Sequence, residues 1–307
     1  MSDATTSAPR ARRFKVSRQL LPYLLSLPAL LTCIGILIPF LTAVWYSLQR
    51  YRLSQPWNRG FNWGQNYLNF MTDSAFWNTL KVSMTYAFAT VALELLLGLG
   101  IALLLQKRNR FNNFVSIMLL MPLMTAPALA SLMWKLMTNP GFGILSYFAT
   151  LLGFEDFRWA SDPKTAMMTV VIVDIWVYTP FIMILLLAGL RSLPKQPFEA
   201  AALDGVPRPF VFWRITLPML TPFLLTATLF RVIESIQQFD IIYAMTQGGP
   251  GDKLTVFQVE AYLNFFQSTN VGRSAALLMI LWAITYTLSN IFIKNWLRLR
   301  EKQRGNA

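Results

Sequence analysis

Six long apolar segments constrain this chain of 307 residues more than any other feature. Each is longer than the roughly 20 helical residues that cross a bilayer core, where backbone groups must find their partners within the helix. The segments are Leu20 to Leu48, Val82 to Gln106, Phe114 to Met137, Thr165 to Leu190, Ile215 to Gln238 and Ser274 to Leu297. They predict an all-α membrane protein with six transmembrane helices and with both termini on one side.

The composition excludes several kinds of chemistry. The chain is 55% hydrophobic and 13% charged, which is too apolar for an ordinary soluble domain. It has no histidine and one cysteine, Cys33, so disulfides, the usual zinc and haem ligand sets and His-dependent catalysis are not available. We therefore expect no catalytic residue, no metal site and no cofactor in this chain.

The basic residues are distributed by topology. Seventeen of the 27 Lys and Arg residues fall on the side of the termini, and Lys135 and Arg231 lie inside apolar segments. The opposite side holds Arg50, Arg52, Arg59, Lys81, Arg158, Lys164, Lys253 and Arg273. By the positive-inside rule the termini are cytoplasmic, so the net charge of +13 does not indicate nucleic-acid binding.

The expected organisation is one membrane domain between two short tails. Residues 1–19 form a cytoplasmic basic tail whose first nine residues we expect to be disordered, 20–298 form the membrane domain, and 299–307 form a cytoplasmic C-terminal tail. The first apolar segment follows basic residues, as a signal peptide would. It is far longer than a signal core and lacks a small-residue cleavage site, so we interpret it as a retained span.

Prolines predict irregular helices in two spans. Pro122 and Pro127 should kink or break the third segment, and Pro180 should do the same to the fourth. The outward loop from Gln49 to Lys81 is rich in aromatic residues, among them Trp63. Anchoring at the bilayer interface explains these aromatics better than a ligand cage does.

A short polar segment, 195–218, separates the fourth and fifth spans and predicts a helix-turn-helix. Pro197 suits a first helical turn, and Ala200 and Ala201 favour helix while allowing another surface to approach closely. Gly205 can adopt the left-handed conformation that ends a helix, and residues 208–214 can form a second one. The segment is typical of a docking element.

A second segment, Phe239 to Gly251, follows the fifth span on the opposite side of the membrane. Its Gly-Gly-Pro-Gly cluster cannot continue a helix and predicts a tight outward turn.

These two segments carry a family resemblance that covers Leu21 to Arg298. The first segment resembles the EAA loop of permeases in ATP-binding-cassette (ABC) importers, because it has the spacing EAA, three residues, Gly, nine residues, I-x-L-P. The second, Phe239 to Pro250, is similar to the FD-x-I-Y-x-x-T-x-GGP element of sugar-type permeases. The resemblance implies a MetI-like fold in a bacterial cytoplasmic (inner) membrane. It also implies these partners: a second homologous permease, two ATPase subunits, an external solute-binding protein, a sugar-like substrate and membrane lipids. Nucleic acid is not an expected partner.

The resemblance also assigns roles within the loop. Glu199 is expected to pair with a basic residue of the ATPase, Ala200, Ala201 and Leu203 form the packed face, and Gly205 makes the turn. The other positions of the coupling motif are Asp204, Ile215, Leu217 and Pro218. No G-x-x-x-x-G-K-[ST] phosphate loop is present, so ATP and Mg²⁺ are expected to bind the partner ATPase.

Ionisable residues inside spans are costly, so Glu94, Lys135, Asp174, Arg231 and Glu234 should face the interior or pair with each other. For Lys135, near the outer end of its span, snorkelling to the membrane surface is the alternative. Thr228, Arg231, Glu234 and Gln238 recur at helical spacing and form one polar stripe. Two interpretations stay open: an ion pair of Arg231 with Glu234 or Asp174, and contact with the solute. The expected substrate path is Asp174, Arg231, Glu234, Gln238, Phe239 and Asp240.

The predicted function is that of a transmembrane subunit that moves a sugar or sugar derivative by alternating access, driven by partner ATPases. An acidic sugar derivative, with a phosphate, sulfonate or carboxylate that Arg231 could hold, is one alternative; polyamine, phosphate or amino-acid import is another. An ion-coupled secondary transporter is disfavoured because no clear internal repeat is found and the EAA loop would have no role. A membrane enzyme is disfavoured because no acid-base pair is arranged for catalysis.

Overall fold

The computed structural model describes residues 21–154 and 157–305. These residues divide into two compact units, with the boundary between Trp45 and Tyr46. The predicted basic tail, 1–19, and the disorder expected within it lie outside the described residues.

The described elements are almost all helical, as predicted. The long helices are α1 (Leu21–Ser47), α3 (Ser74–Leu105), α7 (Ala166–Ser192), α10 (Leu217–Ile236) and α13 (Val271–Gly305). The shorter ones are α2 (Gln65–Thr72), α4 (Arg110–Leu119), α5 (Pro127–Met137), α6 (Ile144–Leu151), α8 (Gln196–Leu203), α9 (Arg208–Val211), α11 (Asp240–Thr246) and α12 (Phe257–Phe266). Two short strands, β1 (Gln49–Arg50) and β2 (Gly60–Phe61), pair antiparallel.

The first unit consists of α1 up to Trp45. This helix has no charged residue between Leu21 and Ser47 and runs through Pro28 and Pro39. A helix that is apolar on every side suits a membrane span rather than the surface of a soluble protein.

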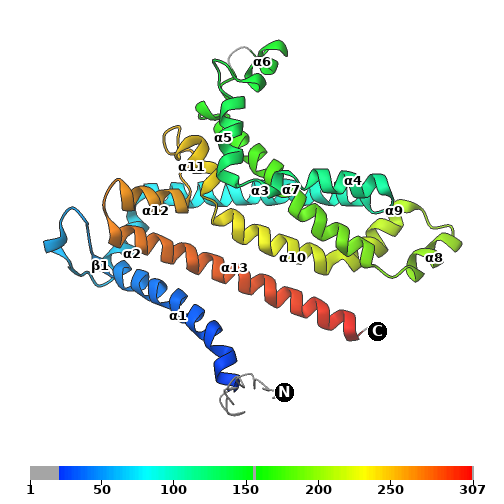
Figure 1. Ribbon diagram of the computed structural model, residues 1–307, viewed down its shortest axis with the longest axis horizontal. Helices are drawn as coiled ribbons and strands as arrows, with labels where there is room; N and C mark the ends of the chain where they lie inside the picture. Colours follow the sequence, from blue (N-terminus) through cyan, green and yellow to red (C-terminus); the bar gives the residue numbers. More distant parts are fainter. Residues whose placement is uncertain (1–20, 155–156, 306–307) are drawn as a thin grey trace, which may run out of the picture. The chain divides into compact units, whose positions relative to one another are not determined.

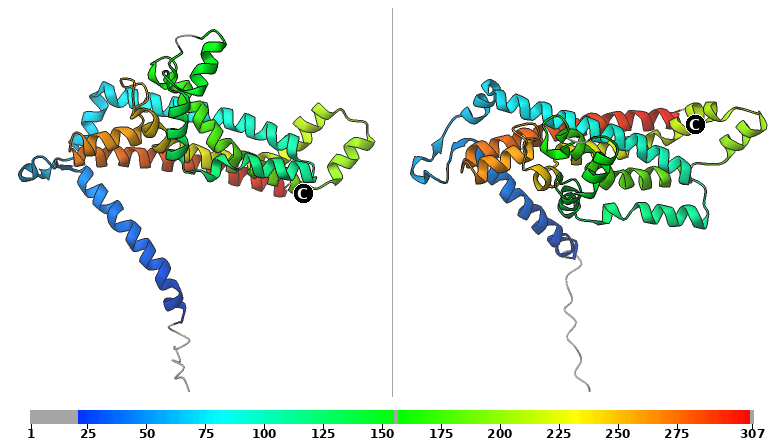
Figure 2. Two further views of the ribbon diagram at one scale, coloured as in Figure 1. Left: turned by 45° about the horizontal axis from the view of Figure 1, so that its top comes forward. Right: turned by 90° about the horizontal axis from the view of Figure 1, so that it is seen from above.

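In the second unit, α3, α7, α10 and α13 form the bundle, with α10 packed against each of the other three (Figures 1 and 2). Two close approaches between these helices occur at glycines. A Cβ on Gly98 of α3 would lie 2.7 Å from Cγ2 of Ile182 in α7, and one on Gly189 of α7 would lie 2.6 Å from Cγ of Phe223 in α10. Small residues allow this approach between membrane helices, where packing replaces the hydrophobic driving force.

The prolines affect the two spans differently. The third apolar segment is broken, as expected, into α4, a 3₁₀ turn (Pro122–Met124) and α5, because Pro122 and Pro127 each begin a new helical segment where a missing N–H costs nothing. Of the kink or break expected at Pro180, the break does not occur, since α7 is continuous through this residue. In the described part of the chain, five rather than six continuous helices are long and apolar enough to cross a membrane.

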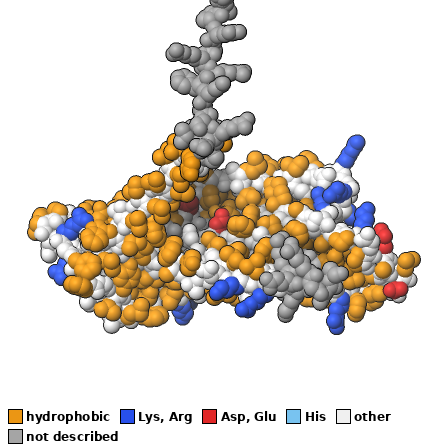
Figure 3. Space-filling model, turned by 90° about the horizontal axis from the view of Figure 1, so that it is seen from below, with side chains coloured by type: hydrophobic (Ala, Val, Ile, Leu, Met, Phe, Trp, Pro, Cys, Tyr) orange, Lys and Arg blue, Asp and Glu red, His pale blue; other side chains and the backbone are white. Residues whose placement is uncertain are grey.

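The two ends of the second unit differ in character. The β1–β2 hairpin and α2 lie at one end of the bundle, and α8 and α9 lie at the other (Figures 1 and 2). Hydrophobic side chains dominate the face drawn in Figure 3, with Lys and Arg mostly near its edges. Helix α13 continues to Gly305, beyond the expected boundary of the membrane domain at residue 298.

Candidate functional site

The centre of the candidate site is Arg231, on the inward face of α10. Leu220, Ala227, Arg231 and Ser235 are all buried and recur at intervals of seven and four residues, so they share one side of the helix. Only 1% of the Arg231 side chain is exposed. A guanidinium in this position is tolerated only when each of its edges meets an acceptor.

Glu94 of α3 supplies two of these acceptors. Its Oε2 accepts from Nε of Arg231 at 2.6 Å, and its Oε1 accepts from Nη2 at 2.8 Å. The Glu94 side chain is fully buried. Next to it, the hydroxyls of Thr90 and Ser235 lie 2.7 Å apart, again joining α3 to α10. The two-point geometry of the Glu94 carboxylate on the Arg231 guanidinium is the strongest and most directional pairing that these two groups can make.

Asp174 brings α7 into the same cluster. Its Oδ2 accepts from Nη2 of Arg231 at 2.8 Å, and its Oδ1 accepts from the amide of Gln238 at 3.0 Å. Asp174 is fully buried, and Gln238 is buried to 8% exposure. One guanidinium therefore holds three helices, α3, α7 and α10, at a single point.

Glu234 differs from the other two carboxylates. It bonds to Nη1 of Arg231 at 3.1 Å, but 54% of its side chain is exposed. The ring of Tyr178, in α7, lies 4.1 Å from Cζ of Arg231 in a cation-π contact. Glu234 thus presents a free carboxylate edge on the outside of the chain, next to a guanidinium that is already occupied.

The ion-pair interpretation of the stripe is confirmed for Arg231 with Asp174 and with Glu234. Glu94 also pairs, as expected of an ionisable residue inside a span, although the polar stripe did not predict its part in this site. Thr228 is not in the cluster, because its hydroxyl bonds to Leu224 O of its own helix. Lys135 is exposed and donates to Ala244 O at 3.3 Å.

Phe239 and Asp240 lie beyond the cluster. The ring of Phe239 stacks on Tyr243 at 4.9 Å and lies 5.2 Å from Tyr262. Asp240 is exposed at the start of α11. Of the residues expected along the substrate path, Asp174, Arg231, Glu234 and Gln238 therefore lie together in one cluster, and Phe239 lies in a neighbouring aromatic group.

The Gly-Gly-Pro-Gly cluster forms the predicted tight turn. Gln247 and Gly248 have φ of 55° and 94°, and Gly251 has φ of 58°. Gly249 N donates to Thr246 O at 3.0 Å, and Leu254 N donates to Gly248 O at 3.1 Å. The chain therefore reverses directly after α11 and leads into α12.

The second candidate site is the segment 195–218, which forms the predicted helix-turn-helix from α8 and α9. Gly205 has φ of 67°. Val206 N donates to Ala201 O at 3.0 Å and Gly205 N to Ala202 O at 3.3 Å, so α8 ends in a Schellman motif that requires the left-handed glycine. Helix α9 then continues through a π-helical turn (Phe212–Thr216) into α10.

The side chains of α8 divide between two faces. Ala201 faces the chain at 6% exposure, whereas Leu203 is 89% exposed. Glu199, Ala200 and Asp204 are exposed as well. Ile215 in the π-helical turn and Leu217 at the start of α10 are half-buried, and Pro218 is exposed. The outer face of α8 thus combines a carboxylate with an uncovered leucine.

A pocket of about 570 Å³ lies beside α8. Its charged lining residues are Arg108, Arg191, Lys195 and Glu199. Arg191 donates to Leu105 O at 2.9 Å and to the Asn113 side chain at 3.3 Å, so the end of α7 is tied to the link between α3 and α4. Within 21–154 and 157–305, no group of three His, Cys, Asp or Glu side chains is arranged to hold a metal ion.

Comparisons with known proteins identify the family of this chain. Residues 94–303 match the family described as binding-protein-dependent transport system inner membrane component. The trehalose/maltose transport system permease protein MalF of Thermococcus litoralis is 32% identical over 283 residues, which cover 92% of this chain and 95% of that protein. The sn-glycerol-3-phosphate transport system permease protein UgpA of Shigella dysenteriae is 33% identical over 279 residues, covering 88% and 91%.

A solved structure shows the same fold. A chain in the crystal structure of a bacterial ABC transporter involved in the import of the acidic polysaccharide alginate matches with a TM-score of 0.78 at 18% identity, covering 92% of this chain and 96% of that one.

Proposed function

The chain belongs to the family of binding-protein-dependent transport system inner membrane components, and from this premise we propose that it is the transmembrane subunit of an ATP-driven importer of a neutral sugar or sugar derivative. As a family member it is a multi-pass membrane transport subunit. The observation that carries the sugar assignment is the 32% identity to a trehalose/maltose permease along nearly the whole length of both chains.

The names of the relatives leave the charge of the solute open, because one relative serves neutral disaccharides and another serves a phosphoester anion. The charges of the cluster favour a neutral solute. Arg231 already donates to three carboxylates, and only the Glu234 carboxylate is exposed. This carboxylate would accept hydrogen bonds from sugar hydroxyls and repel an anion.

We infer that α8 docks in a cleft of a partner ATPase, which binds ATP and Mg²⁺. The support is geometric: Leu203 is 89% exposed beside the Glu199 carboxylate, on a helix whose end is fixed by Gly205. A leucine uncovered to this degree on a predicted cytoplasmic helix gains by burial against a partner. Two such ATPases, a second homologous permease and an external solute-binding protein complete the proposed importer, with both termini of this chain in the cytoplasm.

The cluster around Arg231 gives this transport cycle a mechanical basis. Helices α3, α7 and α10 share one buried ion-pair group, so separating them would expose unpaired charge in a medium of low dielectric. The three helices are therefore expected to move as one body when α8 is displaced. Alternating access would then occur between this body and the partner permease, with ATP biasing the two states.

The experiment is solute uptake by the assembled importer in proteoliposomes, with a panel of neutral disaccharides and acidic sugars. We expect uptake of a neutral saccharide that requires both ATP and the solute-binding protein. Uptake that continues without ATP would contradict the proposal and favour an ion-coupled transporter. Exclusive uptake of an acidic sugar would contradict the neutral assignment only.

A further inference from the structure

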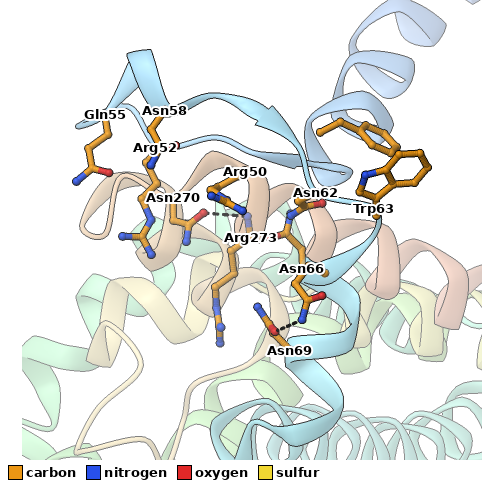
Figure 4. Close-up of a pocket in the computed structure, with 12 residues that line it drawn as sticks. Arg50, Arg52, Gln55, Asn58, Asn62, Trp63, Asn66, Asn69, Asn270 and Arg273 are labelled. Carbon is orange, nitrogen blue, oxygen red and sulfur yellow. Dashed lines mark hydrogen bonds between the residues drawn. The ribbon is translucent and has the colours of Figure 1, made fainter.

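A polar pocket of about 500 Å³ lies at the end of the second unit opposite α8. It is formed by β1, the loop that follows, α2 and the start of α13, and its lining residues are drawn in Figure 4. The lining consists of three arginines, Arg50, Arg52 and Arg273, together with seven Asn or Gln side chains and two aromatic rings, one of them that of Trp63. None of these residues belongs to the Arg231 cluster.

Hydrogen bonds hold the walls of this pocket in place. Asn66 Nδ2 donates to Ser47 O at 2.8 Å and to Gln49 O at 3.0 Å, and Gly272 N donates to Tyr51 O at 3.1 Å. A Cβ on Gly272 would lie 2.2 Å from Gln49 O, so only glycine allows this approach of the hairpin to α13. The arginines therefore project from a braced surface rather than from a loose loop.

The lining carries positive charge without an acidic residue. Arg273 is neutralised by an ion pair with Asp73, and this guanidinium lowers the pKa of the Asp73 carboxyl. Arg50 and Arg52 are exposed and have no carboxylate within ion-pair distance among the described residues. The pocket therefore has two guanidinium groups available to an external anion.

Topology does not explain this concentration of charge. The positive-inside rule places the excess of basic residues on the cytoplasmic side. Arg50, Arg52 and Arg273 are among the eight basic residues on the side predicted to face outward. Yet these three converge on one pocket. Their clustering indicates a ligand rather than an orientation signal.

The rim of the pocket has the character of a protein interface. The Trp63 side chain is 87% exposed although its backbone is held in the left-handed region, with φ of 52°. A bulky residue in that conformation is strained, and such strain concentrates at functional positions. Exposed Trp and Arg side chains are also the residues that most often dominate binding energy between proteins.

We propose that this arginine pocket receives acidic side chains of the external solute-binding protein when that protein docks, with Trp63 as an apolar anchor at the rim. This inference rests on the proposed function, which supplies the partner. Arg50 and Arg52 would each bond a carboxylate in the two-point geometry that a guanidinium favours, and the amides around them would satisfy the remaining lone pairs. Charge pairs at such a rim govern the rate of association and its dependence on salt.

The test measures binding of the importer's own purified solute-binding protein to the assembled complex in nanodiscs, together with the ATP hydrolysis that it stimulates. Arg50→Gln with Arg52→Gln should weaken binding about tenfold at low salt and flatten its salt dependence. Arg50→Lys with Arg52→Lys should retain most of the salt dependence. Trp63→Ala should weaken binding without changing its salt dependence. The matched control is Arg158→Gln with Lys164→Gln, which removes two other predicted outward charges outside the pocket and should leave binding unchanged.

The outcomes separate the two proposals. Stimulated hydrolysis in the wild type together with unchanged affinity in the Arg50 and Arg52 variant would overturn the docking inference alone. Lost solute uptake at unchanged affinity would likewise overturn it and assign the arginines to the solute. Absence of any stimulation in the wild type would overturn the proposed function and this inference with it.

Discussion

Arg231 and Glu94 lie 137 residues apart in the chain and form a two-point ion pair in which the two side chains are 1% and 0% exposed. Asp174 completes the group from a third helix. Ion pairs of this kind are costly to break, because removing one partner leaves the other charged in a medium of low dielectric. The pair therefore fixes α3 to α10 at one point of the bundle.

Arg231→Ala should destabilise the protein by about 3–5 kcal/mol, because it leaves Glu94 and Asp174 buried without a counter-charge. Adding Glu94→Gln to that variant should recover part of the loss, since one of the two stranded charges is removed. Thermal unfolding of the purified proteins in detergent measures both effects. Equal stability of Arg231→Ala and the wild type would show that the pair does not hold the helices together.

Glu234→Gln should weaken uptake without weakening the fold. The carboxylate is 54% exposed, so its substitution should change stability by less than about 0.5 kcal/mol. A hydroxyl bonds more strongly to a carboxylate than to an amide, and we expect the apparent KM for a neutral saccharide to rise about tenfold. Thr228→Ala is the matched control on the same helix, because its hydroxyl bonds only within α10. An unchanged KM in Glu234→Gln would remove Glu234 from the solute path.

Gly205→Val should uncouple ATP hydrolysis from transport. The glycine has φ of 67° and open space around its Cα, so the substitution adds strain rather than a clash. A left-handed β-branched residue costs about 1–2 kcal/mol, which should unwind the end of α8. Gly205→Asn, which tolerates that conformation, should retain coupling. The ratio of solute transported to ATP hydrolysed measures the effect, and an unchanged ratio in Gly205→Val would contradict it.

Gly98→Ala should loosen the contact between α3 and α7. The new Cβ would lie 2.7 Å from Cγ2 of Ile182 and 3.1 Å from the backbone N of Met183, and backbone atoms cannot move aside cheaply. Overpacking of this kind costs about 1–3 kcal/mol. Gly100→Ala, on the same helix with nothing within 4 Å, should be neutral or slightly stabilising. Indistinguishable unfolding temperatures for the two variants would contradict the close packing.

Much of the helical architecture could be predicted because a membrane span is recognised from a local run of apolar residues. The boundaries of α1 and α7 lie within about two residues of the predicted ones, as expected where helix ends fray. Gly205 was predictable for the same local reason, since its role depends on its own backbone angle.

What the sequence could not predict depends on distant partners. The helix breaks at Pro122 and continues through Pro180, although the local sequence does not distinguish the two prolines. Pro180 is buried among neighbouring helices, whereas Pro122 lies in a half-buried segment that starts a new turn. Glu94 was recognisable as a charge inside a span, but nothing local pairs it with Arg231 on a helix so far along the chain. The arginine pocket likewise joins residues near positions 50 and 270 that no short motif links.

The proposed transport cycle requires a partner ATPase to bind the outer face of α8. Cys33 is the only cysteine, so Cys33→Ser gives a cysteine-free background in which Leu203→Cys can carry a short thiol crosslinker. In native membranes we expect Leu203→Cys to capture an ATP-binding-cassette ATPase, identified by mass spectrometry, while Leu68→Cys on α2, at the other end of the bundle, captures none. Failure of Leu203→Cys to capture an ATPase in a complex that transports its solute would contradict the account.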